Sequence, residues 1–129
     1  VYYGASAILL IARILDRKRL GELYEFARNL GLEILVEIHN KEEAKRAVEI
    51  GAEIVGINTR DLDTFQIHKN LVAELVTYLP KNVLKIAESG ISCKEDYQNV
   101  KKMTKNALIG TYFMESKDIE KSFSDLISS

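Results

Sequence analysis

The sequence predicts an α/β fold in which parallel strands alternate with helices, and three observations point to it. Five short apolar runs recur along the 129 residues, and segments with apolar residues at helical spacing separate them. The runs are apolar throughout, as expected for strands that are covered on both faces. Strands joined by helices of about 10 to 15 residues form βαβ units, so the sheet should be parallel.

Each expected strand is a short run of mainly apolar residues. The five runs occupy residues 6–11, 33–38, 53–58, 82–87 and 106–110. Because βα connections are right-handed, we expect consecutive strands to be neighbours and every helix to lie on the outer side of the sheet. A reversal of strand order in the middle of the sheet would instead indicate a doubly wound fold.

The expected helices are amphipathic, and capping residues mark where they begin and end. In the first helix, residues 16–31, Asp16 is the expected N-cap and Gly31 the expected stop. The second, residues 41–51, follows Asn40 as its cap. These two helices fill the gaps between the first three expected strands.

Three more helices are expected in the second half of the chain. Their ranges are 69–79, 93–103 and 116–127. Pro80 ends the first of them, because the residue before a proline avoids helical geometry. Ser92 and Ser116 are the expected caps of the other two.

Composition and charge limit the kinds of molecule that this protein is expected to bind. With 18 basic and 19 acidic residues the net charge is -1, which gives no case for a nucleic-acid surface. No apolar run reaches the roughly 20 residues of a membrane span, and the opening residues VYYGASAILL lack signal-peptide features. The single cysteine, Cys93, excludes an intrachain disulfide. We therefore expect one cytoplasmic domain over residues 1–129, with neither nucleic acid nor membrane as partner.

Polar and small residues gather where the expected strands end. They are Glu37, Asn58, Arg60, Glu88, Ser89, Gly90, Gly110 and Thr111. In parallel α/β folds the carboxyl ends of the strands share one edge, and ligands bind there. The opposite ends of the strands carry no comparable set, so we expect a binding or catalytic site at this rim.

These residues also have purely structural explanations. Glu37 would form an ion pair with Arg60, because buried carboxylates are usually paired, and Asn58 would cap a turn. Residues 88–90 would be turn chemistry alone. His39 would be hydrogen-bonded or solvated, and since nothing nearby has metal-ligand spacing, no metal site is expected. None of these explanations accounts for four successive strands with polar ends on one rim.

Two glycines at the ends of adjacent expected strands indicate an anion site. A short helix could begin after Gly90 and after Gly110, and exposed backbone N–H groups at such positions bind phosphate. Glycine also lets the backbone approach an anion closely. With Thr111, these residues predict a phosphate cradle, which in (β/α)₈ barrels lies after strands seven and eight.

Three segments together resemble the indole-3-glycerol phosphate synthase family. They are LVEIHNKEEAKRAVEIGAEIVGINTRDLDTFQI, KIAESGIS and ALIGTYFMES. The combination of GINTRDL and AESGIS at this separation is specific, and the resemblance covers essentially the whole chain. It implies a (β/α)₈ TIM barrel that needs no metal or organic cofactor. That barrel closes the ring of carboxyphenylamino-deoxyribulose phosphate, with loss of carbon dioxide and water, in tryptophan biosynthesis.

The resemblance also implies a role for each rim residue. Glu37, Asn58 and Glu88 would be catalytic, and Arg60 and Ser89 would bind the substrate. Gly90, Gly110 and Thr111 would bind its phosphate, with Thr111 where the family usually has serine. The family's catalytic lysine, on the third barrel strand, has no counterpart in this chain.

A complete barrel of this kind needs about 250 residues. We therefore expect the chain to supply strands four to eight and to be inactive alone. The expected partners are a phosphorylated substrate and either an N-terminal half-barrel or a second copy. Two alternatives stay open. One is a non-catalytic phosphate-binding half-barrel or self-associating scaffold, and the other is a barrel such as phosphoribosylanthranilate isomerase, which VEIH and GINTRDL disfavour.

Overall fold

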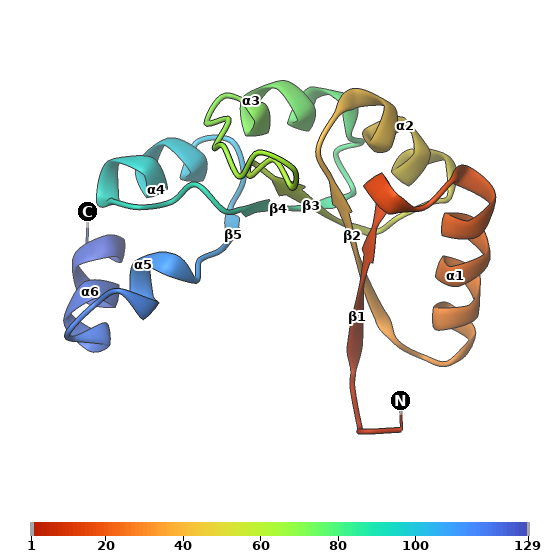
Figure 1. The fold of residues 1–129 in the computed structure, drawn as a ribbon, viewed down its shortest axis with the longest axis horizontal. Helices are drawn as coiled ribbons and strands as arrows, with labels where there is room; N and C mark the ends of the chain where they lie inside the picture. Colours follow the sequence, from red (N-terminus) through yellow and green to blue (C-terminus); the bar gives the residue numbers. More distant parts are fainter. Residues whose placement is uncertain (1, 129) are drawn as a thin grey trace.

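The five strands form one parallel sheet, and their order in space follows their order in the sequence (Figure 1). The computed structural model describes residues 2–128. The strands are β1 (Ala7–Ile11), β2 (Glu33–Ile38), β3 (Ile54–Asn58), β4 (Leu84–Glu88) and β5 (Asn106–Leu108). This unreversed order confirms the predicted barrel-type arrangement and excludes a doubly wound sheet.

Helices follow each strand, as the sequence predicts. They are η1 (Ala12–Ile14), α1 (Arg17–Asn29), α2 (Lys41–Glu49), α3 (Leu71–Leu75), η2 (Val76–Tyr78), α4 (Lys94–Lys101), α5 (Thr111–Met114) and α6 (Ile119–Ile127). Two predicted caps are confirmed. The Asp16 carboxylate accepts a hydrogen bond from the Arg19 amide at 2.7 Å, and the Asn40 side chain accepts one from the Glu43 amide at 2.9 Å.

The two serine caps predicted for the later helices are wrong. The residue that precedes α4 is Cys93, and the Ser92 hydroxyl instead donates to Asp96 at 2.8 Å. The cap of α6 is Asp118, which accepts from the Lys121 amide at 2.9 Å. Ser116 lies two residues earlier, where its hydroxyl donates to the Asp118 carbonyl at 2.8 Å. At α6 a carboxylate thus accepts the bond expected of the serine, whereas at α4 no side chain caps the helix and Asp96 accepts from the Ser92 amide and hydroxyl.

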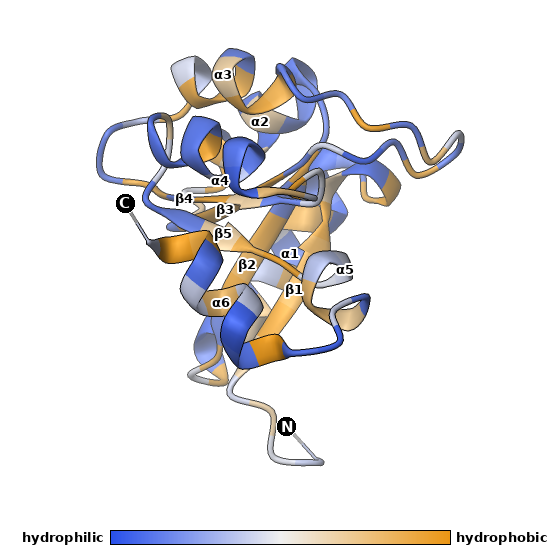
Figure 2. Cartoon of the chain, turned by 90° about the vertical axis from the view of Figure 1, so that its left-hand side faces the viewer, coloured by the Kyte–Doolittle hydropathy of each residue, from blue (hydrophilic) through white to orange (hydrophobic). Residues whose placement is uncertain are grey.

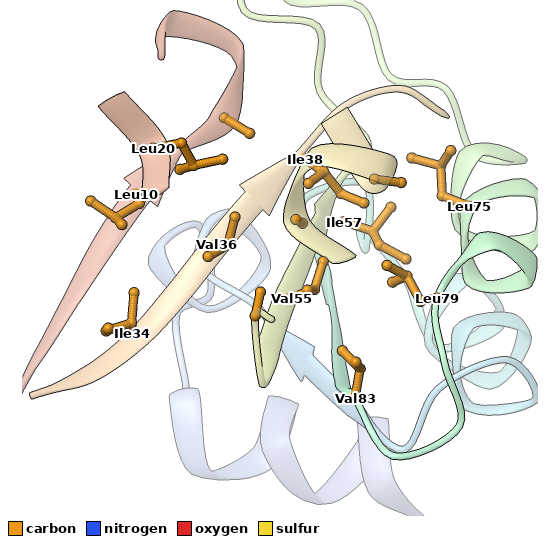
Figure 3. Packing of buried hydrophobic residues seen from close by; sticks show 14 of the residues in the cluster. Leu10, Leu20, Ile34, Val36, Ile38, Val55, Ile57, Leu75, Leu79 and Val83 are labelled. Carbon is orange, nitrogen blue, oxygen red and sulfur yellow. The ribbon is translucent and has the colours of Figure 1, made fainter. Parts of the chain in front are cut away.

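The hydrophobic core lies on the outer face of the sheet, between the strands and the helices (Figure 3). Figure 1 shows α1 to α4 following one another around this side. Val36 and Ile57 of the strands are fully buried there, together with Leu20 of α1 and Leu75 of α3. Alternate strand residues point this way, so the remaining strand residues face the opposite side.

The inner face of the sheet is apolar but uncovered. Leu9, Leu84 and Leu108 lie on it and are 48%, 46% and 59% exposed. In Figure 2 the strands are coloured mainly orange, for hydrophobic residues, whereas α4 and α6 carry blue, hydrophilic segments. In a closed barrel this face would be packed by the side chains of further strands. Within residues 2–128 no helix is both long and apolar enough to cross a membrane.

Candidate active site

All eight predicted site residues line one hollow of about 620 Å³ at the carboxyl rim of the sheet. Strand register brings them together. Glu37 on β2 pairs with Gly56 on β3, and Asn58 at the end of β3 pairs with Glu88 at the end of β4. Because residues in register on parallel strands face the same side, Glu37, Asn58 and Glu88 all point to the inner face.

Gly56, which lies before the end of β3 and outside the predicted set of site residues, makes room for the Glu88 carboxyl group. A methyl group on Gly56 would overlap Glu88 Oε1 and would lie 2.7 Å from Glu88 Cδ. The Glu88 side chain therefore lies across β3, toward Glu37. A glycine inside an otherwise apolar strand is a signal for such a close approach, so the sequence contained a clue.

We expect Gly56→Ala to lower the free energy of unfolding by about 1–3 kcal/mol, because the added methyl overpacks a filled site. It should also displace the Glu88 carboxyl group and lower its pKa. Chemical denaturation and an NMR titration of Glu88 measure the two effects. Gly21→Ala is the control, since a methyl there meets Ile50 at an ordinary 3.6 Å and the helix favours alanine. Equal stability of the two variants would contradict this role for Gly56.

The two rim glutamates have opposite protonation tendencies. Burial, followed by the neighbouring Glu37 carboxylate, raises the pKa of Glu88 to about 8. For Glu37, burial also raises the pKa, but interactions with His39 and Glu88 outweigh it and the net pKa is lowered. At neutral pH the pair therefore holds one proton, on Glu88. A proton donor and a proton acceptor thus face the same hollow.

The ion pair considered between Glu37 and Arg60 is not the pairing that the structure contains. Glu37 Oε1 instead lies 3.3 Å from His39 Nε2. The turn role considered for Asn58 is confirmed, because Asn58 Oδ1 accepts from the Arg60 amide at 3.0 Å.

Ser89 and Gly90, directly after β4, form a left-handed bend at the rim. Ser89 has a φ of 64° and Gly90 a φ of 73°. Thr59 holds the bend, because its amide and its hydroxyl both donate to the Glu88 carbonyl, at 3.0 and 3.2 Å. A methyl group on Gly90 would lie 2.6 Å from Thr59 Oγ1. A non-glycine residue held at positive φ is a feature that clusters at functional sites.

The end of β5 and the residues after it complete the lining of the hollow, with Leu108 and Ile109 followed by two smaller residues. Gly110 and Thr111 line it, and the bulky side chains that follow pack elsewhere. Phe113 packs against Phe123 of α6, with ring centroids 6.2 Å apart, and Tyr112 packs against Phe113. Lys69, a residue that the sequence analysis did not select, also lines the hollow and pairs with Asp96 at 2.6 Å.

The sequential parallel sheet, its outer helices and the polar rim define the chain as part of a (β/α)-barrel protein. Solved structures have the same fold. Thiamine phosphate pyrophosphorylase from Pyrococcus furiosus matches with a TM-score of 0.70 at 18% identity, over 95% of this chain and 57% of that protein. The YdjI aldolase from Escherichia coli matches with a TM-score of 0.63 at 16% identity, over 88% of this chain and 47% of that protein.

The family follows from sequence comparison. The family model for indole-3-glycerol phosphate synthase matches residues 1–126, so the chain belongs to that family. An indole-3-glycerol phosphate synthase of Leptospira interrogans is 53% identical over 96% of this chain and 49% of its own length. The proteins of that name from Nautilia profundicola and Campylobacter jejuni are 46% and 45% identical, over 92% and 97% of this chain. The chain spans about half the length of these curated relatives.

Proposed function

We propose that the chain is the C-terminal half of an indole-3-glycerol phosphate synthase barrel and supplies strands four to eight of eight. The observation that carries this proposal is the Glu37–Glu88 pair at the rim of the sheet in this member of the family. The pKa of Glu37 is lowered and that of Glu88 is raised, so the pair offers one carboxylate and one carboxylic acid. The proposed partner is the N-terminal half-barrel. A cytoplasmic location is part of the proposal, since the enzyme family is biosynthetic and Cys93 is a free, exposed thiol.

The proposed reaction needs both a proton donor and a proton acceptor, the roles of Glu88 and Glu37. Ring closure joins an aromatic carbon to the ketone carbon of the substrate, the carboxylate leaves as carbon dioxide, and the ketone oxygen leaves as water. The oxygen must gain protons before it leaves, and a neighbouring carbon must lose one to give the indole double bond. Glu88 holds a proton to donate and Glu37 is free to accept one. Asn58 orients the substrate beside them.

The phosphate of the substrate is proposed to bind at Gly90, Gly110 and Thr111. At Gly90 the backbone conformation and the contact with Thr59 account for the glycine without any ligand. At Gly110 neither the backbone conformation nor a close contact requires glycine. Its φ is -111°, and a methyl group there would meet no atom of residues 2–128 within 4 Å beyond its chain neighbours. A bound anion close to the backbone would explain why no side chain stands there.

Completing the barrel tests this function. The completed barrel is this chain fused to the N-terminal part of the Leptospira interrogans relative, which is 53% identical over the shared region. We expect it to form indole-3-glycerol phosphate, followed by indole fluorescence, whereas the isolated 129-residue chain should not. Turnover by the isolated chain at the rate of the completed barrel would contradict the proposed division into halves.

Inorganic phosphate provides an independent arm of this test. Added to the isolated chain, it should shift the NMR amide signals of Gly90, Gly110 and Thr111 first. Shifts confined to Lys101 and Lys102 would count against the site. Phosphate binding at the rim without turnover by the completed barrel would instead favour a non-catalytic phosphate-binding module.

A further inference from the structure

We infer that His39 is a positioning residue whose imidazolium, clamped between Glu37 and Glu43, directs the shared proton of the rim pair onto Glu88. The inference rests on the proposed function for its catalytic consequence. Its geometric basis is independent of that function. His39 lies just past the end of β2, two residues after Glu37, and its side chain is 6% exposed.

Both ring nitrogens of His39 face a carboxylate. Nε2 lies 3.3 Å from Glu37 Oε1, and Nδ1 lies 3.2 Å from Glu43 Oε2. A neutral imidazole carries a proton on only one nitrogen and would present a lone pair to one of these carboxylates. Only the imidazolium carries an N–H on both nitrogens, with Nδ1 hydrogen-bonded to Glu43 and Nε2 at ion-pair distance from Glu37 without hydrogen-bond geometry. The contact geometry therefore favours the charged ring.

Glu43 is held in place by its own hydrogen bonds, so it fixes the His39 ring on the side opposite Glu37. It lies in the first turn of α2 and is buried. Its Oε2 accepts from the His39 amide at 2.7 Å, and its Oε1 accepts from Asn40 Nδ2 at 2.7 Å. The Asn40 side chain in turn caps α2. This reciprocal capping is complete without the imidazole, so helix capping alone does not explain the histidine.

Three carboxyl groups face or influence this ring: Glu37 from β2, Glu43 from α2 and Glu88 from β4. The Glu37 and Glu43 carboxylates raise the pKa of His39 to about 9 against the opposing effect of burial. The resulting cation lies next to Glu37 and stabilises its negative charge. The proton that the two rim glutamates share is therefore directed to Glu88.

An NMR titration of the isotope-labelled 129-residue chain tests the inference without any catalytic assay. We expect the His39 imidazole to remain protonated well above its ordinary value of 6.5, with a midpoint near 9. Glu43→Gln should lower that midpoint. His39→Gln should move the first deprotonation of the Glu37–Glu88 pair to higher pH, by about one unit or more. His68→Gln, which alters the exposed second histidine, is the control and should move none of these signals.

The outcomes are separable from those of the proposed function. A His39 midpoint at or below 6.5 in the unaltered chain would overturn the inference, and so would an unchanged Glu37–Glu88 titration in His39→Gln. In an active completed barrel, His39→Gln should move the acidic limb of the kcat profile to higher pH and leave KM nearly unchanged. If the completed barrel is inactive while the titrations behave as expected, the proposed function fails and the proton placement stands.

Discussion

Replacing Glu37 by glutamine in the completed barrel is expected to lower kcat by about 10²- to 10⁴-fold, the usual contribution of a general acid or base. The reason lies in the rim pair. Glutamine keeps the size of the side chain but accepts no proton, and it also removes the charge that, after burial, contributes most to the raised pKa of Glu88. Steady-state kinetics monitored by indole fluorescence measure the loss, which should fall mainly on kcat.

Glu33→Gln is the matched control for this experiment. Glu33 lies on the same strand and the same face of the sheet as Glu37, but at the amino end, where its side chain is exposed. The same change of charge there should alter kcat by less than about twofold, as expected for a surface position away from the site. Equal effects of the two substitutions, or a Glu37→Gln enzyme with nearly full turnover, would remove Glu37 from the mechanism.

Most of the fold could be predicted because its signals are local. Apolar runs set the strands, and the right-handed crossover rule set their order. Helix starts were less certain. Asp16 and Asn40 directly precede α1 and α2 and cap them, whereas α4 begins after Cys93, one residue beyond Ser92, and α6 is capped by Asp118, two residues beyond Ser116. Where each helix begins depends on the path of the loop, and sequence spacing does not contain that path.

The site was predictable to the extent that it depends on strand ends. The rule that strand carboxyl ends share one rim brought eight residues together without knowledge of side-chain directions. It could not identify contacts that depend on register, such as the Glu88 carboxyl lying over Gly56. Nor could it reveal that His39 lies between Glu37 and Glu43, because that contact requires the orientation of a ring.

The isolated chain is expected to self-associate. Its inner sheet face exposes leucines, and its edge strands, β1 and β5, have unpaired backbone groups that recruit other strands. At roughly 25 cal/mol for each Å² of apolar surface removed from water, covering this face gives a substantial driving force. Size-exclusion chromatography with light scattering should therefore give a mass above the 14.6 kDa of one chain.

Two leucine substitutions show which surface drives this association. Leu9→Lys and Leu84→Lys place charges on the inner face, where the leucines are 48% and 46% exposed, and should shift the chain toward the monomer. Phe26→Lys is the control, because Phe26 is 64% exposed on α1, outside the sheet, and should leave the mass unchanged. In the completed barrel the inner face is covered by the N-terminal strands. The exposed leucines should therefore no longer drive self-association of that protein. A stable monomer of the isolated, unaltered chain would mean that the uncovered leucines and strand edges do not need a covering partner.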